Sequence, residues 1–291
     1  MFTHTPVLLN ETLEILNLRP GDNVIDGTVG LGGHAEAILE ATAPNGKLLA
    51  LDRDPRQIET ARVRLARFGE RVTFIHDSFV NLAHLTYVQG ITPINAVLLD
   101  LGFSSVHVDD PTRGFSFQTE GPLDMRYDPA GDLTAAEIIN TWNQEELARI
   151  FLVYGEERQA KKIAQAIVRE RKEKKIQTTL ELADFIATVI PRHGKIHPAT
   201  KVFQALRIVT NDELGEVEKV LPAAIEVLVP GGRLAIITFH SLEDRIVKVF
   251  CKQQNNKTLK IINKHVIVPT EEETKFNPRS RSAKLRVVEK I

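Results

Sequence analysis

Four short apolar runs, each ending in aspartate and each followed by a helical pattern, constrain the fold of this chain most. The runs are Asn23 to Asp26, Lys47 to Asp52, Arg71 to Asp77 and Ile94 to Asp100. Parallel strands need crossovers of a dozen or more residues, which the intervening helical patterns supply, so we predict an α/β fold with a mostly parallel sheet. Open parallel sheets bind ligands at the carboxyl ends of their strands, and the four aspartates therefore outline one rim of a site. Aspartate after a strand is also a common helix cap, which is the better interpretation of Asp54 before Pro55.

A long gap in this pattern predicts an insertion. Between Asp100 and the next convincing strand, Arg233 to Phe239, lie 132 residues, far more than one crossover helix needs. We predict a discontinuous core at residues 1–104 and 201–291 and an inserted helical domain at residues 105–200. The expected elements are insertion helices at 143–154, 156–174 and 180–190, helices returning to the sheet at 198–209 and 212–229, and a closing antiparallel pair at 259–268 and 284–289.

A glycine-rich turn follows the first predicted strand. Gly27, Gly30, Gly32 and Gly33 let the backbone turn sharply and approach a ligand, and His34 opens a helix. Asp52 lies 20 residues after Gly32, at the end of the second strand, where a carboxylate accepts hydrogen bonds from ribose hydroxyls. This combination favours an adenosine cofactor over a merely structural turn.

Two adenosine cofactors fit such a turn, a nicotinamide dinucleotide and S-adenosylmethionine. Asp26 stands at the end of the first strand, where its carboxylate would repel a pyrophosphate but could bind the ammonium group of a methionine moiety. The sequence therefore favours S-adenosylmethionine.

The loop after the fourth strand carries the candidate chemistry. Asp100 offers an acceptor for an exocyclic N–H, and Phe103 offers a ring on which a base could stack, although it could equally cover the end of the sheet. His240, after the fifth strand, could hydrogen-bond a base or cap a helix. The only thiol, Cys251, lies in the predicted helix after Phe239, which disfavours the cysteine-dependent route to carbon methylation.

Composition narrows the class of protein. The chain has 291 residues with 43% hydrophobic side chains, enough for a sizeable core, and its single cysteine excludes an internal disulfide. With no four-ligand zinc pattern we expect no metal, and with a polar amino-terminal segment we expect a cytoplasmic location and no membrane contact. The net charge of −1 means that contact with nucleic acid must come from local patches.

Two basic segments are candidates for such patches. Residues 156–175 contain eight Lys or Arg but are interleaved with glutamates, so a solvated helix face is the better explanation. Residues 275–290, with arginines separated by Pro278 and serines, look more like a segment that contacts phosphates.

Several uncommon strings occur together in this chain and closely resemble the family of ribosomal RNA small subunit methyltransferase H, the 16S ribosomal RNA cytosine-N4 methyltransferases. The resemblance covers nearly the whole chain. The strings lie at His4–Leu9, Asp26–His34, Asp100–Ser105, Arg113–Phe117, Pro122–Arg126 and Phe239–Arg245.

The resemblance implies a class I methyltransferase with a Rossmann-like fold. It implies a bacterial cytoplasmic enzyme that uses S-adenosylmethionine to methylate N4 of one cytidine in the decoding region of 16S ribosomal RNA, within the small ribosomal subunit. The implied cofactor contacts are Gly32, Gly33, His34, Asp52, Phe79, Asp100 and His107. The last stands where many members have glutamine, and imidazole can also donate and accept hydrogen bonds. The expected catalytic group is Asp100, Phe103, Ser104 and His240.

Other functions remain open from the core motifs alone. They are an amino methyltransferase acting on N4 or N6 in DNA or another RNA, a nicotinamide-dependent oxidoreductase, and a catalytically silent RNA-binding factor. A homodimer is compatible with the resemblance, but no heptad or exposed apolar stripe in the sequence predicts one.

Overall fold

The computed structural model describes residues 6–191 and 197–291, so His4 and Thr5 of the first family-like string lie outside the described residues. The chain divides into two compact units. We call Met1–Gly102 with Leu214–Ile291 the core unit, and Phe103–Glu213 the helical unit.

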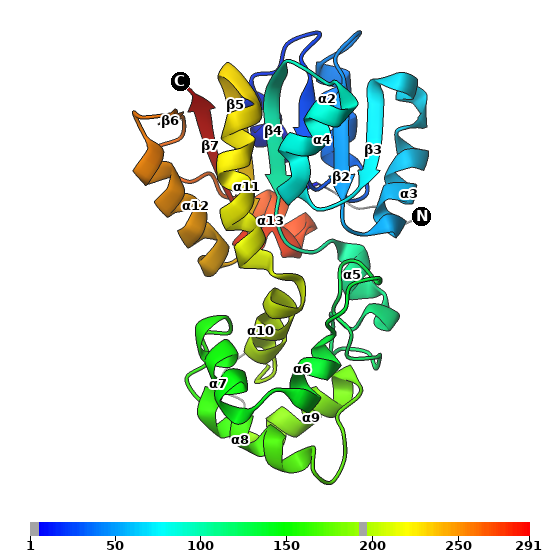
Figure 1. Ribbon diagram of the computed structural model, residues 1–291, viewed down its shortest axis with the longest axis vertical. Coiled ribbons are helices and arrows are strands. Elements are labelled where there is room, and N and C mark those ends of the chain that lie inside the picture. The colour runs from blue at the N-terminus through cyan, green and yellow to red at the C-terminus, as the bar shows by residue number, and fades with distance from the viewer. Residues whose placement is uncertain (1–5, 192–196) are drawn as a thin grey trace. The chain divides into compact units, whose positions relative to one another are not determined.

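The core unit is built on a seven-stranded sheet with the order β3-β2-β1-β4-β5-β7-β6 (Figure 1). The first five strands of the chain pair in parallel, and β7 pairs antiparallel with both β5 and β6. The strands are β1 (Val24–Asp26), β2 (Leu48–Asp52), β3 (Val72–His76), β4 (Ile94–Asp100), β5 (Leu228–Thr238), β6 (Leu259–Ile261) and β7 (Lys284–Lys290).

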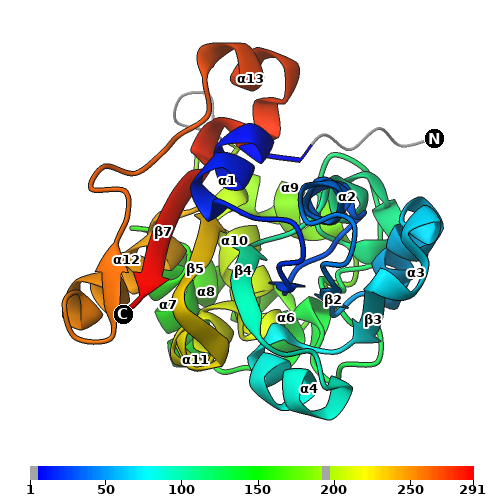
Figure 2. The same ribbon diagram turned by 90° about the horizontal axis from the view of Figure 1, so that it is seen from above.

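Helices cover both faces of this sheet (Figure 2), because successive strand residues point to opposite sides. In β2, Leu48 and Ala50 pack with α1, α2 and α3, whereas Leu49 and Leu51 pack on the other face with α4, α11 and α12. The helices of this unit are α1 (Leu9–Leu16), α2 (Gly33–Ala41), α3 (Pro55–Arg64), α4 (Leu82–Gln89), α11 (Glu213–Val227), α12 (Ser241–Gln254) and α13 (Glu271–Phe276).

The predicted strands differ from the observed ones mainly at their ends. β3 ends at His76, so Asp77 follows the strand instead of closing it. β5 begins at Leu228, earlier than expected, because the pairing with β4 shifts register between Ile94 and Ala96. That irregularity lets Pro230 and its neighbouring glycines lie within the strand, where regular pairing would exclude a proline.

Among its described residues, the helical unit has its own apolar core, to which α6 (Ala135–Thr141), α7 (Gln144–Val153), α8 (Ala160–Glu170), α9 (Thr179–Val189) and α10 (Thr200–Asn211) contribute. A short helix, α5 (Ser105–Asp109), precedes them in the chain. Local sequence explains two of the starts: Asn143 with Glu146 and Thr178 with Glu181 form capping boxes at α7 and α9.

The prediction that residues 198–209 return to the sheet is wrong. Val202, Phe203 and Leu206 of α10 are buried in the core of the helical unit, and the unit boundary falls after Glu213 rather than near residue 200. An amphipathic pattern shows that a helix buries one face but not against which partner.

Among the described residues, no helix is long and apolar enough to cross a membrane.

Candidate active site

The glycine turn is held between neighbouring strands. The amide of Gly27 donates to Leu98 O at 2.9 Å in β4, and that of Val29 donates to Leu51 O at 2.8 Å in β2. A Cβ on Gly27 would lie 2.6 Å from Leu99 Cδ2, and one on Gly33 would lie 2.3 Å from Pro6 Cγ. A side chain at Gly33 would therefore clash with Pro6, and one at Gly27 would require the Leu99 side chain to shift.

Asp52 supports this turn from the end of β2. Its Oδ2 accepts the Gly30 amide at 2.9 Å, and its Oδ1 accepts the Asp54 amide at 2.8 Å. Asp54 in turn caps α3, as predicted, by accepting the Arg56 amide. Each oxygen of Asp52 has a second lone pair, so the same carboxylate can accept ribose hydroxyls while it positions the turn.

Asp26 is a buried carboxyl group at the end of β1, only 1% exposed. Its Oδ1 accepts the Thr28 amide at 3.1 Å, whereas Oδ2 has no hydrogen-bond partner within the described part of the chain. Burial, with a smaller contribution from the negative charge of Asp52, raises the pKa of Asp26 to about 7. A buried carboxylate oxygen without a partner is costly, and a cationic ligand would offset that cost.

Asp100 is the last residue of β4, the strand that pairs with β1. Its amide donates to Thr28 Oγ1 at 2.7 Å, a contact that the sequence reading missed although Thr28 lies inside the glycine turn. Burial, followed by the negative charges of Asp26 and Glu243, raises the pKa of Asp100 well above its ordinary value. Its Oδ1 is a second buried carboxylate oxygen with no hydrogen-bond partner among the described residues.

His34, in the first turn of α2, connects to Asp100. The ring Nε2 lies 3.0 Å from Val7 O, which can only accept, so Nε2 carries a proton. Nδ1 lies 3.6 Å from Asp100 Oδ2. Attraction between these two atoms then requires one further proton, carried either by the imidazole or by the carboxyl group. The imidazole therefore lies within ion-pair distance of the carboxyl group that ends β4.

Phe79 follows β3 in a short 3-10 helix, Phe79–Asn81, which Ser78 caps by accepting the Val80 amide at 3.2 Å. Its ring packs partly buried against the apolar face that includes α4. Core packing therefore accounts for part of the Phe79 side chain, and its Cβ also lies against Gly27.

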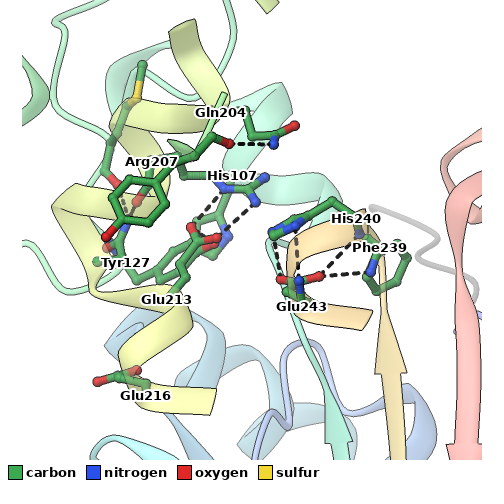
Figure 3. A network of polar contacts seen from close by, with 12 residues as sticks. His107, Tyr127, Gln204, Arg207, Glu213, Glu216, Phe239, His240 and Glu243 are labelled. Carbon is green, nitrogen blue, oxygen red and sulfur yellow. Dashed lines mark hydrogen bonds and ion pairs between the residues drawn. The ribbon is translucent and has the colours of Figure 1, made fainter. Parts of the chain in front are cut away.

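His240 caps α12. Its Nδ1 accepts the Glu243 amide at 3.4 Å, and Glu243 Oε2 accepts the amides of Phe239 and His240 in return (Figure 3). His240 Nε2 also lies 3.1 Å from Glu243 Oε1. Of the two interpretations of His240, the structure accounts fully for the helix cap.

Phe103, Ser104 and His107, the remaining predicted site residues, belong to the helical unit. Ser104 precedes α5 and His107 is buried within it, with His107 Nδ1 accepting the Ser104 amide at 3.2 Å. Phe103 is 41% exposed, and the guanidinium of Arg207 lies 4.4 Å from its ring centre. This cation–π contact steadies a ring that remains accessible to a ligand.

An ion pair at the end of α10 supports that arginine. Arg207 binds Glu213 through two contacts of 2.8 and 2.9 Å, and Tyr127 donates its hydroxyl to the same carboxylate at 2.9 Å (Figure 3). Asn211 accepts the Tyr127 amide at 2.8 Å, which ties the loop before α6 to α10. The sequence reading missed Tyr127 and Glu213 because they lie 86 positions apart and no local pattern relates them.

Comparison with known proteins identifies the family. The model of the MraW methylase family matches residues 1–291, the entire chain. The chain belongs to the MraW methylase family. Proteins named ribosomal RNA small subunit methyltransferase H are 50% identical in Desulfotalea psychrophila, covering 99% of this chain and 98% of that protein, and 46% identical in Carboxydothermus hydrogenoformans, covering 100% and 98%.

A solved structure from Clostridium thermocellum, a candidate rRNA methylase, aligns over 99% of this chain with a TM-score of 0.50 and 15% identity. That similarity supports the class I methyltransferase fold. Membership in the MraW methylase family also decides between the two cofactor classes that the glycine turn left open, against a nicotinamide-dependent oxidoreductase.

In this MraW methylase, several basic side chains of the carboxyl-terminal segment, residues 275–290, contact the protein itself. Arg286 and Lys284 of β7 bind Asp244 of α12 at 2.7 and 3.2 Å, and Lys290 donates to the backbone carbonyls of Glu226 and Leu228, so three of the six basic residues at 275–290 are engaged within the core unit. Arg279 and Arg281 are exposed. In the other basic segment, Lys174 pairs with Glu181 at 2.6 Å, in keeping with a solvated helix surface.

Proposed function

We propose that this chain transfers a methyl group from S-adenosylmethionine to the exocyclic N4 of a cytidine in the RNA of the small ribosomal subunit. The partnerless oxygen of Asp26 beside the glycine turn carries this proposal. It is the feature that a sulfonium amino acid with an ammonium group requires and a pyrophosphate opposes. The names of the full-length relatives supply the class of substrate.

The core unit has the residues to hold this cofactor. Asp26 would bind the ammonium group, Asp52 the ribose hydroxyls, and the turn at Gly32 and Gly33 the carboxylate, near the amides that open α2. His34 opens the same helix, and Phe79 would contact the adenine. When bound, the cofactor supplies an activated methyl group, and no metal is needed for that chemistry.

The acceptor side needs a group that binds the cytidine amine, whose lone pair is delocalised into the ring. Asp100 meets this need, because its Oδ1 has an open acceptor position and its raised pKa makes the carboxylate a stronger base. His34 Nδ1 lies 3.6 Å from the other oxygen of Asp100, Oδ2, so Oδ1 would remain for the amine. The proton on N4 would leave after methyl transfer.

The loop that follows Asp100 would position the base. Phe103 offers a half-exposed ring steadied by Arg207, and backbone carbonyls near Ser104 offer further acceptors. His107 is a proposed cofactor contact from the helical unit, and we propose that this unit selects the RNA. The structure gives His240 a capping role, so we assign it to positioning the end of β5.

Methyl transfer to undermodified RNA tests the proposal. The protein is incubated with labelled S-adenosylmethionine and either small ribosomal subunits, free small-subunit RNA or DNA of the same sequence, and the modified nucleosides are then identified. Labelled N4-methylcytidine at one position in RNA supports the proposal. Label in DNA, or on adenine N6, would instead favour the broader amino methyltransferase function.

The role of Asp100 is tested separately. We expect Asp100→Asn to bind the cofactor but to lose most turnover at saturating cofactor, because an amide accepts a proton poorly. Full turnover in that variant would rule out the carboxylate as the proton acceptor. With ribosomal RNA as its substrate, the enzyme would act in the cytoplasm.

A further inference from the structure

A basic segment of the core unit is not explained by the cofactor site. Residues 245–270 contain six Lys or Arg and no Asp or Glu, although the whole chain has a net charge of −1. The segment forms most of α12, then β6 and the loop after it. Figure 1 shows α12 beside β6 and β7, at the end of the sheet opposite β3.

Several of these cations gather around a hollow in that surface. Lys248 and Lys252 lie one helical turn apart on α12, and Lys264 follows β6. These three lysines, with Arg286 and the buried Cys251, line a hollow of about 100 Å³. A space of that size holds several waters or one phosphate group with some of its hydration.

The lysines of residues 245–270, which we call the strip, form no ion pair among the described residues. Within residues 6–191 and 197–291 no ion pair involves the five exposed lysines of the segment, which are Lys248, Lys252, Lys257, Lys260 and Lys264. Elsewhere in the core unit, exposed Arg64 and Arg67 both bind Glu36. Lysines at i and i+4 repel each other, so an unpaired cluster of this kind favours an anionic partner.

Simpler explanations cover only part of the strip. Lysines blunt exposed edge strands, which accounts for Lys260 on β6, and a cation near the end of α12 complements the helix dipole, which accounts for Lys252. Neither effect explains why Lys248 and Lys264 join Lys252 and Arg286 around a concave surface. Arg286 is already neutralised by Asp244, so the lysines supply the unbalanced charge.

We propose that Lys248, Lys252 and Lys264 form a binding surface for the phosphodiester backbone of the RNA substrate. This inference rests on the proposed function and adds a contact that the core unit itself makes with the RNA. α12 runs from the carboxyl end of β5 for 14 residues, which is about 21 Å, long enough to follow several consecutive phosphates. A hollow lined by three lysines fits the phosphates of a nucleic acid strand better than the flat surface of an anionic membrane.

The test is the salt dependence of RNA binding by the full-length protein. The strip variant is Lys248→Gln/Lys252→Gln/Lys264→Gln, and the matched control is Arg19→Gln/Lys47→Gln/Arg62→Gln, which removes the same charge from exposed positions outside the strip. Affinity for a small-subunit RNA fragment is measured from about 50 to 200 mM salt, the range over which phosphate contacts change affinity most. Cofactor affinity serves as the check on folding.

We expect the strip variant to bind RNA roughly 10- to 50-fold more weakly near 0.15 M salt, with the log–log salt slope reduced by about 2, because each single-strand phosphate contact contributes about 0.7 to that slope. The control variant should keep most of its affinity. Equal losses in the two variants, or none in the strip variant, overturn the inference. So does unchanged RNA binding with lost binding to phosphatidylserine vesicles, which would assign the strip to a membrane.

Methyl transfer separates this inference from the proposed function. If the wild-type protein methylates the RNA while the strip variant binds it normally, only the inference fails. If RNA binding depends on the strip but no methyl transfer to RNA occurs, the proposed reaction fails and the binding surface stands.

Discussion

The ionisation of Asp26 gives the sharpest prediction, because this buried carboxyl group is proposed to bind the ammonium group of the cofactor. With a pKa of about 7, Asp26 is mainly neutral in the free protein at pH 6 and mainly ionised at pH 8. The α-amino group of the ligand has a pKa of about 7.8 and loses its charge over the upper part of the same range. Binding should therefore be strongest where both charges are present.

The size of the effect follows from these two values. The product of the two ionised fractions is about 0.09 at pH 6 and peaks at about 0.5 near pH 7.4, using ordinary titration behaviour. Affinity for S-adenosylmethionine should thus rise about sixfold between these pH values and fall again above pH 8. Isothermal titration calorimetry at constant ionic strength measures this dependence of cofactor affinity on pH directly.

Asp26→Asn removes the titrating group while keeping its shape. We expect the amide variant to lose the rise between pH 6 and 7.4 and to bind the cofactor at least 10-fold more weakly at the optimum, which corresponds to about 1.4 kcal/mol. An amide variant that keeps both the wild-type affinity and the rise in affinity between pH 6 and 7.4 would refute the assignment of Asp26 to the ammonium group.

The same substitution should stabilise the protein. A folded-state pKa above the unfolded value means that Asp26 favours folding below its unfolded pKa near 3.8 and that this contribution is lost as the pH rises through about 7. The raised pKa corresponds to a destabilisation of the folded protein by at most about 4 kcal/mol at neutral pH, which the substitution removes. The buried unsatisfied amide of the asparagine costs about 1–3 kcal/mol in return. Thermal unfolding of Asp26→Asn at pH 7.5 should therefore show a higher Tm, and little gain should appear near pH 4.

Three further predictions concern the turn and the helical unit. Asp52→Asn should weaken cofactor binding roughly 10-fold by calorimetry, because the amide cannot accept through its nitrogen, and unchanged affinity would exclude the ribose contact. Gly33→Ala should lower the free energy of unfolding by about 1–3 kcal/mol in denaturant titrations, because the added Cβ meets Pro6, and wild-type stability would show that the turn yields easily. Arg207→Ala should destabilise the helical unit by about 3–5 kcal/mol, because it removes the cation that pairs with the buried carboxylate of Glu213. Hydrogen exchange confined to that unit reports the change. Arg207→Ala/Glu213→Gln should recover much of the loss, and no recovery would mean that packing dominates.

Local patterns were sufficient for most of the core unit. The alternation of apolar runs with helical patterns predicted the parallel strands β1 to β4, and the glycines after the first run predicted the turn that joins β1 to α2. These features depend on residues close together in the chain, since strand and helix periodicities are local properties. The strings that resemble the methyltransferase family added the substrate class, which no periodicity contains.

Tertiary structure alone decided the features that depend on distant neighbours. Whether Asp26 is ionised depends on burial by the surrounding sheet and helices, because desolvation is set by everything packed around the group. The core that α10 joins, the pairing of Arg286 with Asp244 and the contact between Tyr127 and Glu213 each link segments far apart in the chain. The amino-acid sequence by itself determined which groups line the ends of the strands, and only the packing decided their protonation and their partners.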